Sequence, residues 1–106
     1  MIQSQGHLTY DLQQLEDFCR RWQVRQLSLF GSALRNDFKP ESDLDFLVGF
    51  RKGSEWDALD LFAMQDELEG WFGRKVDLVK DTWIQNPIRR NRILETRKVL
   101  FESGQE

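Results

Sequence analysis

Two aspartates open a stretch of chain that otherwise has the composition of a buried β-strand. Asp43 and Asp45 are separated by one residue, and the apolar residues Phe46, Leu47 and Val48 follow at once. On a strand, residues i and i+2 point to the same face, with Cα atoms roughly 6.5 Å apart. Two carboxylates so close repel each other, and burying one without compensation is costly. A divalent cation such as Mg²⁺ would relieve the repulsion, whereas the plainer interpretation is a strand that begins at a polar loop.

A third acid stands in a second apolar segment. Asp77 interrupts the run from Lys75 to Lys80, and its side chain points opposite to Val76 and Leu78 if the segment is a strand. Should this strand neighbour the first, three carboxylates would converge on one face of a sheet. Three acids can hold two metal ions, an arrangement that promotes phosphoryl transfer. The alternative is an edge-strand acid turned to solvent.

A glycine and a serine end the strand that precedes both aspartates. Gly31 lets the backbone approach a ligand closely, and the following turn presents N–H groups to an anionic phosphate. The Ser32 hydroxyl can donate to a phosphate oxygen, and Arg35, one turn later, can reach the same anion or pair with an aspartate. Gly-Ser alone only marks a turn; together with the three acids it indicates a nucleotide-phosphate site.

Hydrophobic spacing predicts the remaining elements around this candidate site. Residues 1–8 are polar and are expected to be frayed, and Thr9 is expected to cap the first helix. The other predicted elements are that helix as far as Trp22, strands over 24–30, 43–50, 75–80 and 98–102, a helical turn over 32–36, a loop over 37–41, and helices over 56–71 and 87–96. The predicted fold class is α/β (α+β): one domain over 1–106, with a small mixed sheet and helices packed largely on one side.

Composition narrows the range of functions. The net charge of −3 gives no global basic field, so no direct nucleic-acid binding is expected. The single cysteine, Cys19, fits a reducing compartment and a structural role. No apolar run approaches the roughly 20 residues of a membrane span. These features predict a cytoplasmic protein without membrane contact.

Two groups of side chains leave alternatives open. Arg89, Arg90 and Arg92 suit a solvated helix face or an acidic partner, although one of them contacting phosphate is also possible. The aromatic residues exceed what a small core obviously needs, so some are candidates for a partner surface and others for the core. They are Trp56, Trp71, Phe72 and Trp83.

The combined pattern resembles a known superfamily. The string from Gly31 to Arg35, followed by Ser42-Asp43-Leu44-Asp45 and by Asp77 on a later strand, is similar to the DNA polymerase β-type nucleotidyltransferases. More narrowly, it resembles the minimal nucleotidyltransferases, the MntA-like antitoxins encoded beside HEPN-domain toxins. The resemblance covers about residues 8 to 102. One departure is Asn36, which stands where many members have glycine.

The resemblance implies a fold, a site and a reaction. It implies a mixed sheet flanked by helices and transfer of AMP from ATP to the tyrosine hydroxyl of a HEPN ribonuclease toxin, which neutralises the toxin. Asp43 and Asp45 would bind two Mg²⁺ ions, and Asp77 would complete the metal site and help to deprotonate the acceptor hydroxyl. The residues implied to contact the nucleotide are Gly31, Ser32, Arg35 and Ser42.

Two other functions remain compatible with the sequence. A binding module would neutralise the toxin by occlusion alone, with an idle metal site. A small-molecule nucleotidyltransferase of the aminoglycoside type would transfer the nucleotide to a different hydroxyl. The three acids favour a catalytic protein, since a purely occluding antitoxin has no need for them.

Overall fold

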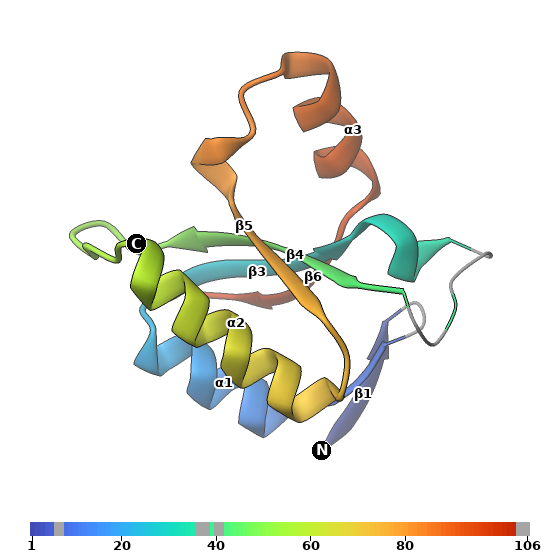
Figure 1. Ribbon diagram of the computed structural model, residues 1–106, viewed down its shortest axis with the longest axis vertical. Helices are drawn as coiled ribbons and strands as arrows, with labels where there is room; N and C mark the ends of the chain where they lie inside the picture. The colour runs from blue at the N-terminus through green and yellow to red at the C-terminus, as the bar shows by residue number, and fades with distance from the viewer. Residues whose placement is uncertain (6–7, 36–38, 40–41, 104–106) are drawn as a thin grey trace.

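The computed structural model describes residues 1–5, 8–35, 39 and 42–103 (Figure 1). Its strands are β1 (Ile2–Gln5), β2 (Leu8–Asp11), β3 (Val24–Phe30), β4 (Leu44–Phe50), β5 (Val76–Lys80) and β6 (Lys98–Glu102). Its helices are α1 (Leu12–Arg21), α2 (Ala58–Phe72) and α3 (Pro87–Thr96), with 3₁₀ turns η1 (Gly31–Leu34) and η2 (Asp81–Trp83). The mixed α/β class predicted from the sequence is confirmed. Most of the predicted loop, together with Asn36, lies outside the described residues.

A four-stranded mixed sheet forms the centre of the molecule. The strand order is β5-β4-β3-β6, and β3 runs antiparallel to both of its neighbours. Strands β4 and β5 are parallel, and α2 makes the crossover that a parallel connection requires. This connection places the starts of β4 and β5 at the same edge of the sheet.

Alternation along the strands divides the core between the two faces of the sheet. Leu44 and Phe46 of β4 pack into the main cluster beneath α1 and α2, where Phe18 and Trp71 meet edge to face. Leu47 points the other way, into a smaller cluster with Ile93 of α3. Two of the three helices therefore share one face, as predicted, and α3 covers part of the other (Figure 1).

The N-terminal prediction was wrong. Residues Ile2–Gln5 are not frayed: they pair with Leu8–Asp11 in a two-stranded antiparallel hairpin. The hairpin buries Leu8 and Tyr10 against the main core, and this burial favours the strand over a longer helix. Thr9 lies within β2, and the cap of α1 is Asp11, whose carboxylate accepts from the backbone N–H groups of Gln13 and Gln14. Asp and Thr both cap helices well, so local sequence alone did not decide between them.

The ends of the other helices follow their capping residues. Asp57 and Asp60 form a capping box at the start of α2, so this helix begins two residues later than predicted. Gly73 ends α2 in the left-handed conformation, with φ of 66°. Asn86 caps α3, and Pro87 occupies its first turn, so this helix has the predicted bounds.

Cys19 and two of the tryptophans discussed above belong to the core. Cys19 is fully buried, and burial raises the pKa of its thiol to about 12, which fits a structural role. Trp56 and Trp71 pack against the main core, whereas Trp83 is 54% exposed. Within the described part of the chain, no helix is both long and apolar enough to cross a membrane.

Candidate active site

Strand pairing brings two of the three predicted acids together. In the parallel pair of β4 and β5, Asp45 lies directly opposite Asp77. Asp43 immediately precedes β4 and is exposed, as is Asp77, while Asp45 is half-buried. The two strands that carry the acids are therefore neighbours in the sheet, which the sequence alone did not establish.

The Asp45 carboxylate occupies an electrostatically strained position. Its pKa is raised, chiefly because burial removes water and then because Asp77 adds negative charge nearby; Asp43 makes a smaller contribution in the same direction. The backbone N–H of Ser32 donates to this carboxylate, and Arg35 lies close enough to favour its charged form. Asp77 and Asp43 thus both act on Asp45 at the edge of the sheet, and a bound cation would relieve this repulsion.

The Gly-Ser turn packs directly against these acids. Gly31 has a positive φ of 77°, and a Cβ placed on it would collide with Oδ2 of Asp45. The Ser32 hydroxyl donates to the backbone carbonyl of Asp43 at 3.2 Å. Glycine and serine are therefore what allow η1 and the start of β4 to approach each other so closely.

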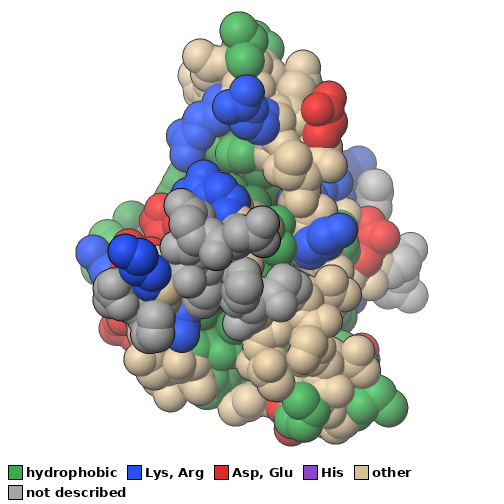
Figure 2. All heavy atoms as spheres, turned by 90° about the vertical axis from the view of Figure 1, so that its right-hand side faces the viewer, with side chains coloured by type: hydrophobic (Ala, Val, Ile, Leu, Met, Phe, Trp, Pro, Cys, Tyr) green, Lys and Arg blue, Asp and Glu red, His purple; other side chains and the backbone are tan. Residues whose placement is uncertain are grey.

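A cleft of about 780 Å³ opens beside Asp45, between η1 and α3. Its lining comprises Phe30, Gly31, Leu34, Arg35, Asp45, Arg89, Arg92, Ile93, Thr96 and Lys98. Among the described residues that line the cleft, four are cationic and one, Asp45, is a carboxylate. Figure 2 views this side of the molecule. It shows Lys and Arg side chains in the upper half of the view, with hydrophobic side chains between them. The size of the cleft, together with its apolar and cationic lining residues, suits an anionic organic ligand.

The structure does not bring every predicted residue to the cleft. Of the predicted site residues, Gly31, Arg35 and Asp45 line the cleft, and its lining does not include Ser32, Ser42, Asp43 or Asp77. The Ser42 hydroxyl accepts from the backbone N–H of Lys39. Among the described residues, no group of three or more His, Cys, Asp or Glu side chains is arranged so that it could hold a metal ion. The donor chemistry nevertheless fits Mg²⁺, because the three acids offer only hard oxygen ligands and Asp45 carries the repulsion that a cation would remove.

Comparison with known proteins identifies the family. The model of the nucleotidyltransferase domain matches residues 12–105, which is nearly the whole chain. The chain belongs to the nucleotidyltransferase domain family. The matched range includes the four-stranded sheet, and the chain is a nucleotidyltransferase.

Relatives support this membership, and a solved structure shares the fold. This nucleotidyltransferase is 41% identical over 71 residues to a protein of Methanocaldococcus jannaschii whose assignment as a protein adenylyltransferase is provisional; the match covers 67% of this chain and 73% of the relative. It is 32% identical over 75 residues to the protein adenylyltransferase MntA of Thermococcus cleftensis, covering 71% and 74%. The fold matches a crystal structure of a toxin–antitoxin with AMP-PNP, with a TM-score of 0.70, 18% identity, and coverage of 90% and 76%.

Sequence reasoning missed Lys98 and Thr96 as residues of the cleft. Lys98 begins β6, which pairs with the end of β3 next to the Gly-Ser turn. The sequence carries no local signal for this, since a lysine at a strand start is ordinary. Only the pairing of two strands far apart in the chain places it in the nucleotidyltransferase cleft.

The raised pKa of Asp45 predicts a pH-dependent stability difference. The folded chain holds the Asp45 proton more tightly than the unfolded chain does. The contribution of Asp45 to the free energy of unfolding is therefore greatest below its unfolded pKa and is lost as pH rises through its folded pKa. We expect Asp45→Asn to unfold at higher urea concentration than wild type at pH 7, with the difference vanishing near about pH 3. Urea unfolding in EDTA at both pH values measures this, with exposed Asp66→Asn as the control. Equal midpoints for Asp45→Asn and wild type at pH 7 would contradict it.

Proposed function

We propose that this nucleotidyltransferase moves AMP from ATP to a tyrosine hydroxyl of a HEPN-type ribonuclease toxin and thereby neutralises the toxin. One observation carries the proposal: Asp45 lies opposite Asp77, against a Gly-Ser turn, at the edge of a cationic cleft. Likeness to the adenylyltransferase MntA and to a toxin–antitoxin crystallised with AMP-PNP supports a protein acceptor and ATP as the donor.

The cleft and the turn would position the nucleotide. The Gly-Ser turn allows close approach of the phosphates, and Arg35 supplies positive charge beside it. Half-buried Asp45 and exposed Asp43 would hold Mg²⁺, with Asp77 completing the set. When bound, Mg²⁺ neutralises phosphate charge and stabilises the developing charge of the reaction.

The reaction itself is an in-line exchange of oxygens at phosphorus. The acceptor oxygen forms a bond to the α-phosphorus while the bond to the oxygen bridging to the β-phosphorus breaks, and diphosphate leaves with that electron pair. Asp77 would accept the hydroxyl proton. Its side chain is exposed and opposite Asp45, so a tyrosine on the surface of a large folded partner can reach it. The open edge of the sheet thus suits a protein acceptor.

A labelling experiment tests this function. The purified chain is incubated with Mg²⁺ and the HEPN protein of the neighbouring gene, in parallel with ATP labelled on the α-phosphate and ATP labelled on the γ-phosphate. We expect the partner to become labelled only from the α-phosphate, because AMP transfer releases the β- and γ-phosphates. Label from the γ-phosphate would indicate phosphorylation instead. Absence of label combined with full protection from the toxin would favour neutralisation by occlusion.

A further inference from the structure

We propose that Arg89 and Arg92 of α3 bind the β- and γ-phosphates of the nucleotide and hold the leaving diphosphate. The inference rests on the proposed function, since it concerns the phosphates of the same nucleotide. It assigns phosphate binding to two of the three arginines clustered on α3. Both residues line the cleft that Asp45 and Gly31 also line. Neither guanidinium makes a hydrogen bond or an ion pair with another described residue.

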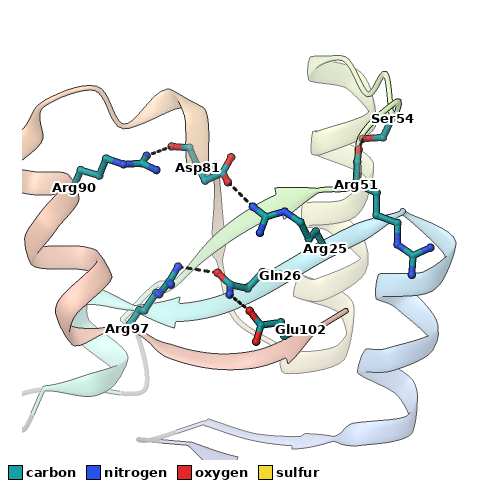
Figure 3. Close-up of polar contacts among 8 residues, drawn as sticks. All are labelled: Arg25, Gln26, Arg51, Ser54, Asp81, Arg90, Arg97 and Glu102. Atoms are coloured by element: carbon teal, nitrogen blue, oxygen red, sulfur yellow. Dashed lines mark hydrogen bonds and ion pairs between the residues drawn. The ribbon is translucent and has the colours of Figure 1, made fainter. Parts of the chain in front are cut away.

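Helix geometry separates these two arginines from the third. Residues three apart on a helix lie on the same face, so Arg89 and Arg92 point together into the cleft. Arg90 is turned away: its guanidinium donates to the backbone carbonyl of Asp81 at 2.8 Å (Figure 3). Arg90 therefore anchors the helix, while its neighbours remain available to a ligand.

The charges in the cleft call for an anion with several charges. Arg35, which directly follows η1, and Lys98, the first residue of β6, add positive charge to the cleft that the two arginines of α3 line. Cations that share one cleft repel each other, and an anion bound among them relieves this repulsion. Arginine is well suited to this, because its planar fork of donors matches phosphate oxygens. The leaving diphosphate carries multiple negative charges, which these side chains can stabilise.

The position of α3 is fixed by polar contacts on its other side. The Asp81 carboxylate, at the end of β5, pairs with Arg25 of β3 at 3.3 Å. Arg97 donates to the side chain of Gln26 at 2.8 Å, and Gln26 donates to Glu102 at 2.6 Å (Figure 3). These contacts tie both ends of α3 to the sheet. Arg89 and Arg92 are thus held over the cleft before a ligand arrives, which lowers the entropic cost of binding.

Titration calorimetry tests the inference with inorganic diphosphate and with ATP, both without Mg²⁺. We expect Arg89→Ala and Arg92→Ala each to weaken binding about tenfold, and the double variant about a hundredfold. The matched control is Arg20→Ala, which removes the same charge from an exposed position on α1 outside the cleft. Arg89 and Arg92 are both exposed, so the variants should fold, and their melting temperatures verify this.

The outcomes separate this inference from the proposed function. Wild-type affinity for diphosphate in the double variant would overturn the inference, as would an equal loss in Arg20→Ala, which would indicate a net-charge effect. Loss of partner labelling with unchanged ATP affinity would make α3 a docking surface for the protein partner and would also overturn it. Weakened diphosphate binding in the double variant, in a chain that never labels the partner, would support the phosphate site while contradicting AMP transfer.

Discussion

Replacing Asp45 by asparagine is expected to reduce nucleotide transfer by on the order of a thousandfold or more while leaving the chain folded. Asparagine has nearly the same shape and can still accept from the Ser32 N–H, so the packing of η1 on β4 should persist. The lost negative charge is what matters, because a neutral amide binds Mg²⁺ far more weakly than a carboxylate does. The measurement is the initial rate of partner labelling from ATP carrying label on its α-phosphate.

Two comparisons make this result specific to the acid cluster. Asp77→Asn should cause a comparable loss, since Asp77 lies opposite Asp45 in the strand register. Asp66→Asn, an equally conservative change at an exposed position of α2, should leave the rate unchanged. If Asp45→Asn kept a tenth or more of wild-type transfer, the acid cluster would not be the catalytic centre. Melting temperatures of all three variants guard against loss of rate through unfolding.

Replacing Gly31 by alanine is expected to lower transfer at least about a hundredfold and to cost about 1 to 2 kcal/mol of stability. Two effects combine at this position. The positive φ of 77° is unfavourable for any residue with a Cβ, and that Cβ would collide with Oδ2 of Asp45. The carboxylate is the movable end of a side chain, so the clash is relieved by displacing it. The activity should therefore suffer far more than the fold.

Gly53 supplies the matched control for this substitution. It also has a positive φ, 88°, but a Cβ placed there meets nothing within 4 Å. Gly53→Ala should thus show a similar stability cost from backbone strain alone, measured by urea unfolding, with wild-type transfer. If both alanine variants retained transfer, close packing of Gly31 on Asp45 would have no part in the reaction. If both lost it equally, general destabilisation would be the cause.

The sequence predicted those elements around the site that are determined by interactions between residues close together in the chain. Alternation in 43–50 predicted which face of β4 carries Asp45, and the main core confirms it with Leu44 and Phe46 on the opposite face. The helices predicted over 56–71 and 87–96 are present because Gly73 ends the first and Pro87 starts the second, through backbone preferences that act within one turn. The N-terminal hairpin was not predicted, because the local sequence is polar. Its strands are stabilised by packing of Leu8 and Tyr10 on a core that is distant in the chain.

By itself the sequence determined the chemical parts of the site: the acids, the Gly-Ser turn, and the strands and helices that carry them. Only the tertiary structure decided that Asp45 lies opposite Asp77, that Lys98 joins the cleft, and that Arg90 turns from it. The reason is the range of the forces involved. Capping, turn conformation and side-chain alternation act between residues close in the chain, whereas strand register and helix docking depend on packing between segments far apart in it.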